Sequence, residues 1–143
     1  MNRLTITNAR ILPMSEPRTF GGFVRIADGA IEEVGEGTAG SASGDGEVID
    51  AAGYVLMPGL INAHTHLYQV LLRAVWEDLA LMPWLERIYG CARVLRPEHF
   101  YVGSLLGCME AIRSGVTMVC EHNFLNPEPE CASETLRADR SRY

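Results

Sequence analysis

The chain has 143 residues, the length of one ordinary domain, and its 48% hydrophobic and 21% charged residues are typical of a globular protein. The formal net charge of −6 argues against nucleic acid as a partner, because proteins that bind it carry a basic surface that neutralises phosphates. The first residues lack the apolar core of a signal peptide, and no segment approaches the roughly 20 apolar residues of a membrane span. We therefore expect a cytoplasmic protein with neither a nucleic-acid nor a membrane partner.

The first 57 residues are predicted to form a small, mainly antiparallel sheet. Apolar and polar residues alternate there in short runs, which is typical of strands with one buried face. The dipeptide Asp28-Gly29 predicts a hairpin turn, and residues 35–46, rich in glycine, serine and alanine, predict a mobile loop. We expect strands at residues 4–12, 23–27, 30–34, 47–50 and 54–57.

An apolar run then ends in two histidines one residue apart, His64 and His66. Successive side chains on a strand point to opposite faces, so these two imidazoles leave the same face and can converge on one metal ion. An isolated H-x-H is common by chance, so the spacing alone favours two partly exposed histidines beside a turn over a metal site.

The second half is predicted to form a strand-helix-strand unit. A first helix is expected to extend to Tyr89. A longer one opens at Arg96 and Pro97 and stops at Gly115, with an inward face made of Val102, Leu105, Leu106, Met109 and Ile112. Residues 116–120 predict a buried parallel strand. A helix start with Ser133 as its cap follows, and the pattern predicts that this helix does not continue into residues 139–143.

Residues 58–67, from Pro58 to Leu67, closely resemble the amidohydrolase superfamily of metal-dependent deaminases and hydrolases, whose first barrel strand carries the pattern P-G-hydrophobic-hydrophobic-N-x-H-x-H. The resemblance implies an α/β fold, with a small N-terminal β-sandwich segment over residues 1–57 and the first βα units of a (β/α)₈ TIM-type barrel over residues 58–143. It also implies that His64 and His66 hold one divalent ion, zinc or iron, at the mouth of the barrel. Because catalytic zinc normally has three protein ligands and this chain supplies two, we expect the truncated chain to hold the ion weakly.

The family's remaining metal ligands, two histidines and an aspartate, lie on later barrel strands, as does the glutamate of an H-x-x-E motif that moves the proton. This chain contains no H-x-x-E. We therefore expect a truncated barrel with no catalytic residue of its own and with little or no hydrolase activity when isolated.

Two further residues are candidates for contact with a substrate. Gln69 lies three residues after His66, where purine and triazine deaminase-like members of the family place a polar group near the substrate ring. A solvated residue at a helix start is an equally good interpretation of Gln69. His122, with Glu121 and Asn123 beside it, follows a predicted strand, and barrel enzymes gather functional residues at such strand ends. The resemblance assigns His122 to the support of the site or to substrate contact, and not to the metal ligands.

Other chemistry-bearing residues are predicted to be structural. Trp76 and Trp84 are candidates for the lining of the substrate pocket that the resemblance implies, but the core is the favoured place because large aromatic side chains bury much area. His99 is expected on the surface. The four cysteines lack a C-x-x-C pair, which predicts reduced and mostly buried thiols.

Three functions are compatible with this sequence. The first is a metal-dependent hydrolase acting on carbon-nitrogen bonds other than peptide bonds, which deaminates a purine, pyrimidine or triazine-like ring. The second is a fragment that complements a separately encoded C-terminal part, and the third is a non-catalytic β-plus-βα module without metal chemistry. Zinc sites of the cytidine deaminase and H-E-x-x-H types are excluded, because their motifs are absent. The expected partners are a small heterocyclic substrate and, because strand edges stay uncovered, another copy of the chain or the complementing fragment.

Overall fold

The computed structural model describes residues 2–40 and 46–140, which divide between Pro58 and Gly59 into two compact units. The mobile loop expected over residues 35–46 lies partly outside the described residues, at 41–45, whereas Gly35 and Glu36 belong to a strand. Within the described residues, the helices are too short or too polar to cross a membrane.

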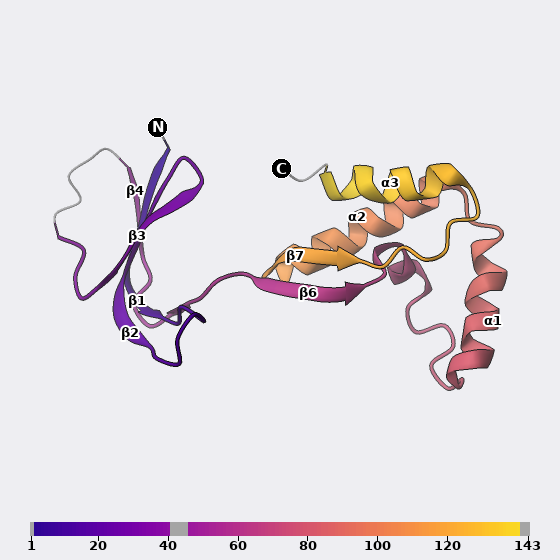
Figure 1. The fold of residues 1–143 in the computed structure, drawn as a ribbon, viewed down its shortest axis with the longest axis horizontal. Helices are drawn as coiled ribbons and strands as arrows, with labels where there is room; N and C mark the ends of the chain where they lie inside the picture. The colour runs from indigo at the N-terminus through magenta and orange to yellow at the C-terminus, as the bar shows by residue number, and fades with distance from the viewer. Residues whose placement is uncertain (1, 41–45, 141–143) are drawn as a thin grey trace. The chain divides into compact units, whose positions relative to one another are not determined.

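The N-terminal unit is a five-stranded sheet (Figure 1). Its strands are β1 (Arg3–Ile11), β2 (Phe20–Ala27), β3 (Ala30–Glu36), β4 (Glu47–Asp50) and β5 (Val55–Leu56). The antiparallel pairing of β1, β2 and β3 agrees with the sequence prediction, and Asp28 and Gly29 turn the hairpin with φ of 49° and 82°. In contrast, β4 and β5 both pair with β1 in parallel, which alternation along the sequence does not reveal.

A small apolar cluster on this sheet is built on Ala9, Ile11 and Val24. Beside it the pairing of β1 with β2 is irregular, and Asn8 adopts a φ of 58°, a conformation that asparagine tolerates better than most residues. The Asn8 side-chain amide donates a 2.9 Å hydrogen bond to Oδ1 of Asp50, which links β1 to β4. This hydrogen bond lowers the pKa of Asp50.

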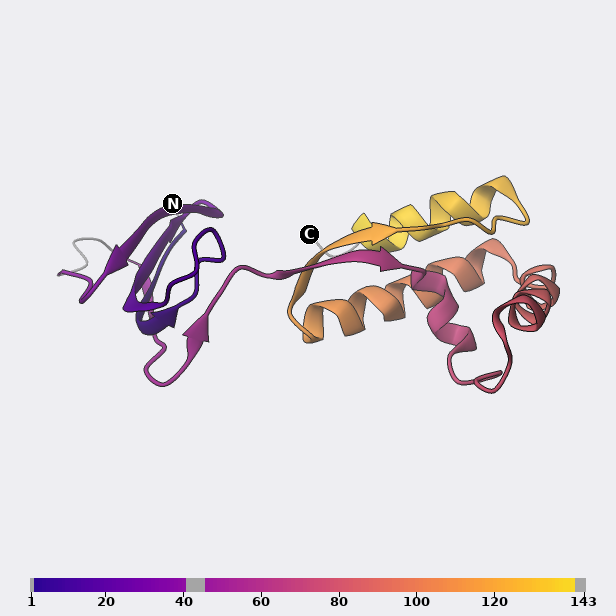
Figure 2. The same ribbon diagram turned by 60° about the horizontal axis from the view of Figure 1, so that its bottom comes forward.

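The second unit contains a pair of parallel strands with helices. Its elements are β6 (Leu60–Thr65), the 3₁₀ helix η1 (Leu67–Leu72), α1 (Leu81–Ala92), α2 (Pro97–Arg113), β7 (Val116–Glu121) and α3 (Pro129–Arg140). The parallel pairing of β6 with β7 agrees with the predicted strand-helix-strand unit. In both Figure 1 and Figure 2, α1 lies beyond the ends toward which β6 and β7 point.

The buried face of α2 differs from the prediction. Four of the residues expected to face inward are 40–55% exposed: Val102, Leu106, Met109 and Ile112. The buried residues are instead Phe100, Gly103, Ser104, Gly107 and Cys108. A Cβ added to Gly103 would lie 2.7 Å from the Tyr68 carbonyl oxygen, and one added to Gly107 would lie 2.9 Å from that of Leu67. The two glycines therefore let the backbone of η1 lie directly on α2, which a count of large apolar residues misses.

The helix α3 also corrects the prediction, because it begins at Pro129 and runs through to Arg140. It lies beside α2 (Figures 1 and 2) and buries Cys131, Thr135 and Ala138, whose spacing is that of one helix face. The buried Ser104 hydroxyl donates to Oγ1 of Thr135 at 3.3 Å. Small residues again form the contact. The prediction ended the helix before residue 139 because the residues from there on are charged and lack a helical period, yet Asp139 and Arg140 belong to α3.

The prediction that residues 116–120 form a buried strand is wrong within the described part of the chain. Parallel strands are usually covered on both faces. Here Ile61 on β6 and Met118 on β7 are 67% and 61% exposed. Among the four cysteines, Cys108 and Cys131 are buried, Cys120 is exposed, and the described residues contain no disulfide.

Candidate metal centre

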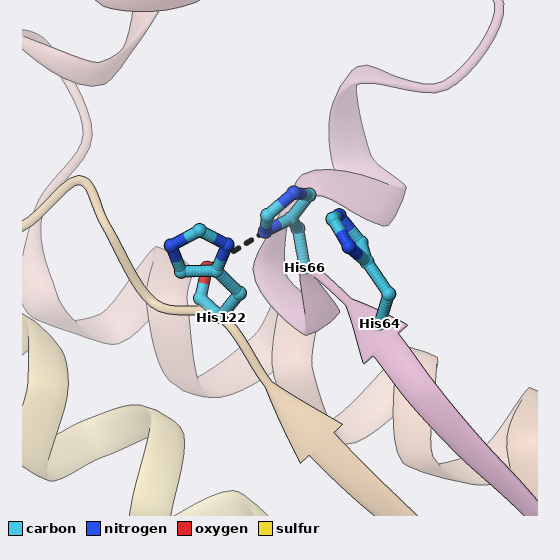
Figure 3. A group of neighbouring side chains, drawn as sticks. All are labelled: His64, His66 and His122. Carbon is cyan, nitrogen blue, oxygen red and sulfur yellow. Dashed lines mark hydrogen bonds between the residues drawn. The ribbon is translucent and has the colours of Figure 1, made fainter.

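Three histidines meet where β6 and β7 end (Figure 3). His64 lies on β6, His66 directly follows that strand, and His122 directly follows β7. Each offers a ring nitrogen, and these ligand atoms all lie within 4.8 Å of one another. The alternation of side chains that predicts convergence of the first two histidines therefore agrees with the structure, and the parallel pairing adds a third.

The backbone explains why His122 reaches this position. Its N–H donates a 2.9 Å hydrogen bond to the carbonyl oxygen of Thr65, which extends the ladder between β6 and β7 by one step. The carboxyl ends of two parallel strands consequently stop side by side. Two features of the sequence together indicate this meeting of histidines: the polar residues 121–123 that follow the second strand, and the H-x-H at the end of the first.

His66 is the most constrained of the three rings. Its Nδ1 lies 2.7 Å from the carbonyl oxygen of His122, and since a carbonyl only accepts, Nδ1 carries the proton. The Nε2 atom of neutral His66 is then left as a lone-pair donor to an ion. The Phe124 ring also packs edge-on against His66, with ring centres 5.0 Å apart.

Glu121 ties the end of β7 to the turn that carries His66. Its Oε2 accepts a 2.7 Å hydrogen bond from the backbone N–H of Leu67, the first residue of η1. Its other oxygen, Oε1, is buried and has no hydrogen-bond partner within residues 2–40 and 46–140. Burial raises the pKa of Glu121, and the Leu67 N–H opposes this rise. The carboxyl group thus fixes the segment between β6 and η1.

A pocket of about 370 Å³ opens beside the histidines. It is lined by His64, His66, Gln69, Trp76, Trp84 and seven others that include Arg73 and Glu77, with Ile88 at the α1 side. Gln69 thus lies in the same pocket as the histidine pair, while its Nε2 donates to the hydroxyl of Tyr68 at 3.1 Å. The two tryptophans are half-buried and line this pocket, which was the less favoured of the two places expected for them.

The fourth histidine lies outside the cluster, as expected for a surface residue. His99 is exposed in the first turn of α2, where its Nδ1 accepts a 2.9 Å hydrogen bond from the Arg96 N–H. The metal role of His64 and His66 and the substrate role of Gln69 and His122 remain predictions at this point.

Known proteins resemble this chain along almost its whole length. A 5'-deoxyadenosine deaminase from Methanosarcina acetivorans is 42% identical over 99% of the chain and 33% of its own length. A 5-methylthioadenosine/S-adenosylhomocysteine deaminase from Desulforamulus reducens is 46% identical over 82% of the chain and 28% of its own length. The chain therefore spans about a third of the length of the curated relatives it matches.

Solved structures show the same fold. An atrazine chlorohydrolase from Arthrobacter aurescens TC1, complexed with zinc, matches 96% of the chain and 33% of its own length, with a TM-score of 0.83 and 21% identity. A guanine deaminase from C. acetobutylicum matches 98% of the chain and 33% of its own length, with a TM-score of 0.77 and 18% identity. These likenesses confirm the α/β fold class, with its N-terminal sheet and its first part of a barrel.

The family assignment rests on the model of the amidohydrolase family, which matches residues 55–140. The matched segment contains β6, β7 and all three clustered histidines. The chain therefore belongs to the amidohydrolase family.

Proposed function

We propose that this chain carries the metal-binding first part of a hydrolase that acts on carbon-nitrogen bonds other than peptide bonds, by deaminating a purine, pyrimidine or triazine-like ring. The observation that carries the proposal is the convergence of His64 and His66 at the mouth of a pocket. The names of the relatives support it, since both are deaminases of adenine-containing compounds.

The donor set fits a divalent ion of the zinc or iron class. Imidazole nitrogens suit these metals, whereas an all-oxygen site would favour magnesium or calcium. His64 and His66 would hold the ion, and the Nδ1–H of His66 already has its acceptor in the His122 carbonyl. When bound, such an ion acts as a Lewis acid and lowers the pKa of a coordinated water, which is the chemistry that hydrolytic deamination needs.

The residues that line the pocket suit a planar aromatic substrate. Trp76 and Trp84 line the pocket together with the histidine pair, and aromatic rings stack favourably on indole faces. Gln69 has one amide that both donates and accepts hydrogen bonds, which suits the alternating donors and acceptors of a purine or triazine edge. We assign Gln69 the positioning of the ring, with the scissile carbon directed toward His64 and His66.

The metal part of the proposal is tested on the chain itself. We expect the 143-residue protein to bind one zinc ion and His64→Ala and His66→Ala to lose it, while His99→Gln, outside the cluster, binds as the parent does. Because two histidine ligands hold the ion weakly, bound zinc is measured by elemental analysis after equilibrium dialysis against a zinc solution. Equal zinc content in all four proteins would contradict the metal site and favour the non-catalytic module.

The deaminase part is tested in a chimaera. Residues 1–140 would replace the matching third of the Methanosarcina acetivorans relative, and ammonia release from 5'-deoxyadenosine would be measured. We expect activity that His64→Ala abolishes and His99→Gln leaves intact. A folded, zinc-loaded chimaera that releases no ammonia would refute the assignment of this segment to ring deamination.

A further inference from the structure

We propose that Glu121 is a positioning residue for His66, because its carboxyl group caps the first turn of η1 and leaves the His66 ring available to the ion. Glu121 acts on the backbone beside His66 and is not one of the clustered metal-binding side chains. The inference goes beyond the proposed function and rests on it only for the existence of the ion. The orientation of the His66 ring itself is measured without any metal.

The turn that follows β6 lacks the usual kind of cap. The first N–H groups of a helix need acceptors, and the residue before the helix commonly supplies one from its own side chain. That residue is His66, which makes no side-chain cap hydrogen bond within the described part of the chain. Its ring faces the other histidines and the His122 carbonyl oxygen (Figure 3). The first turn of η1 contains no aspartate or glutamate of its own. The acceptor therefore has to come from another part of the chain.

Glu121 supplies this acceptor from 54 positions away. Its Oε2 accepts the Leu67 N–H at 2.7 Å, and a carboxylate is a strong acceptor for such an N–H. The backbone of the same residue pairs with Thr65 in the ladder between β6 and β7. Glu121 therefore holds both neighbours of His66, Thr65 through the strand pairing and Leu67 through its side chain.

Leu67 is also held at its carbonyl group, against α2. A Cβ added to Gly107 would lie 2.9 Å from the Leu67 carbonyl oxygen, and the Leu67 side chain is buried. With both its N–H and its carbonyl oxygen fixed, Leu67 sets the direction in which His66 leaves the chain. This direction keeps Nδ1 of His66 at 2.7 Å from the His122 carbonyl oxygen, and Nε2 is left for the ion.

The inference is tested with histidine ring ¹⁵N spectra of the 143-residue protein at about pH 8, where an ordinary histidine is neutral, first without metal and then during a zinc titration. Glu121→Gln keeps an acceptor for the Leu67 N–H, whereas Glu121→Met fills similar space without one. We expect the parent and Glu121→Gln to hold the His66 proton on Nδ1. Glu121→Met should show a mixture of the two His66 tautomers and a zinc affinity lower by about 10-fold, at the lower end of the roughly 10–100-fold cost of losing a group that orients a ligand.

Ser104→Ala is the control for a loss of stability alone, because it disturbs the contact between α2 and α3. It should match the parent in both the His66 tautomer and the zinc affinity.

A further measurement needs no variant and covers the case in which Glu121→Met fails to fold. The Leu67 amide hydrogen of the parent should exchange with solvent far more slowly than exposed amides do, because it is hydrogen-bonded to Glu121. Fast exchange of this hydrogen, or an unchanged His66 tautomer and zinc affinity in Glu121→Met, would overturn the role of Glu121 and leave the proposed function standing. A parent that binds no zinc, combined with a lost tautomer preference in Glu121→Met, would overturn the proposed metal site and support the positioning of His66.

Discussion

Replacing Gly103 with alanine tests the packing that seats η1 beside the histidines. Alanine favours a helix over glycine by about 1 kcal/mol, and we expect that gain at Gly90 in α1, where an added Cβ would meet nothing within 4 Å. At Gly103 the new Cβ would lie 2.7 Å from the Tyr68 carbonyl oxygen and 3.0 Å from Cδ1 of Leu71. Ordinary contact begins at about 3.5 Å, so the two backbones must separate by roughly 0.8 Å.

Overpacking of this kind costs about 1–3 kcal/mol. Because both variants share the same helix-propensity gain, Gly103→Ala should be less stable than Gly90→Ala by about that steric cost, and less stable than the parent by about 1 kcal/mol. Urea unfolding followed by far-ultraviolet circular dichroism measures the difference, read from the midpoints at equal slope. A Gly103→Ala protein as stable as Gly90→Ala would show that η1 does not lie against α2 at that distance.

Three other predictions follow from single contacts. Phe100→Ala removes one ring of a fully buried stacked pair and should cost about 3–5 kcal/mol in urea unfolding; a loss below 1 kcal/mol would contradict its burial. Ser104→Ala should lower the free energy of unfolding by only about 0.5–1.5 kcal/mol, because Thr135 keeps a second hydrogen-bond partner on its own helix. It is compared with Thr135→Val, which removes the hydroxyl group that takes part in both hydrogen bonds. The Asn8 amide lowers the pKa of Asp50 in the folded protein. The hydrogen bond between them therefore stabilises the fold above the ordinary aspartate pKa, and this stabilisation is lost as the pH falls through the lowered pKa of Asp50. Asp50→Asn should therefore unfold with a flatter acid dependence below about pH 4, and an unchanged acid profile would count against this contact.

The histidine pair was predictable because it depends only on local geometry. In any strand, residues i and i+2 leave the same face, so His64 and His66 converge whatever surrounds them. The place of His122 depends on the register between two strands that are 56 residues apart. Sequence alone predicted that both strands end in polar residues, but not that the main chain of one would bond the ring of the other.

The error about the buried face of α2 has a physical origin, which is that close packing here relies on small residues. Large apolar residues on α2 predicted its inward face, yet Gly103 and Gly107 are buried because only they admit the carbonyl groups of η1. The extent of α3 was underestimated at both ends, because Ser133 looked like its cap and the charged residues after Ala138 lacked a helical period; its buried face consists of Cys131, Thr135 and Ala138. A pattern of hydrophobic residues along the sequence does not reveal a contact between two backbones.

These small-residue contacts bear on the metal centre because they hold one histidine more firmly than its neighbours. His66 is fixed from one side by η1, whose first N–H bonds Glu121 and whose backbone rests on the α2 glycines. It is fixed from the other side by the His122 carbonyl oxygen. The His64 N–H donates to the Asn62 side chain, and its ring is exposed. An ion bound as proposed would therefore meet one preset nitrogen, on His66, and the ordering of the His64 ring would set the entropic cost of binding.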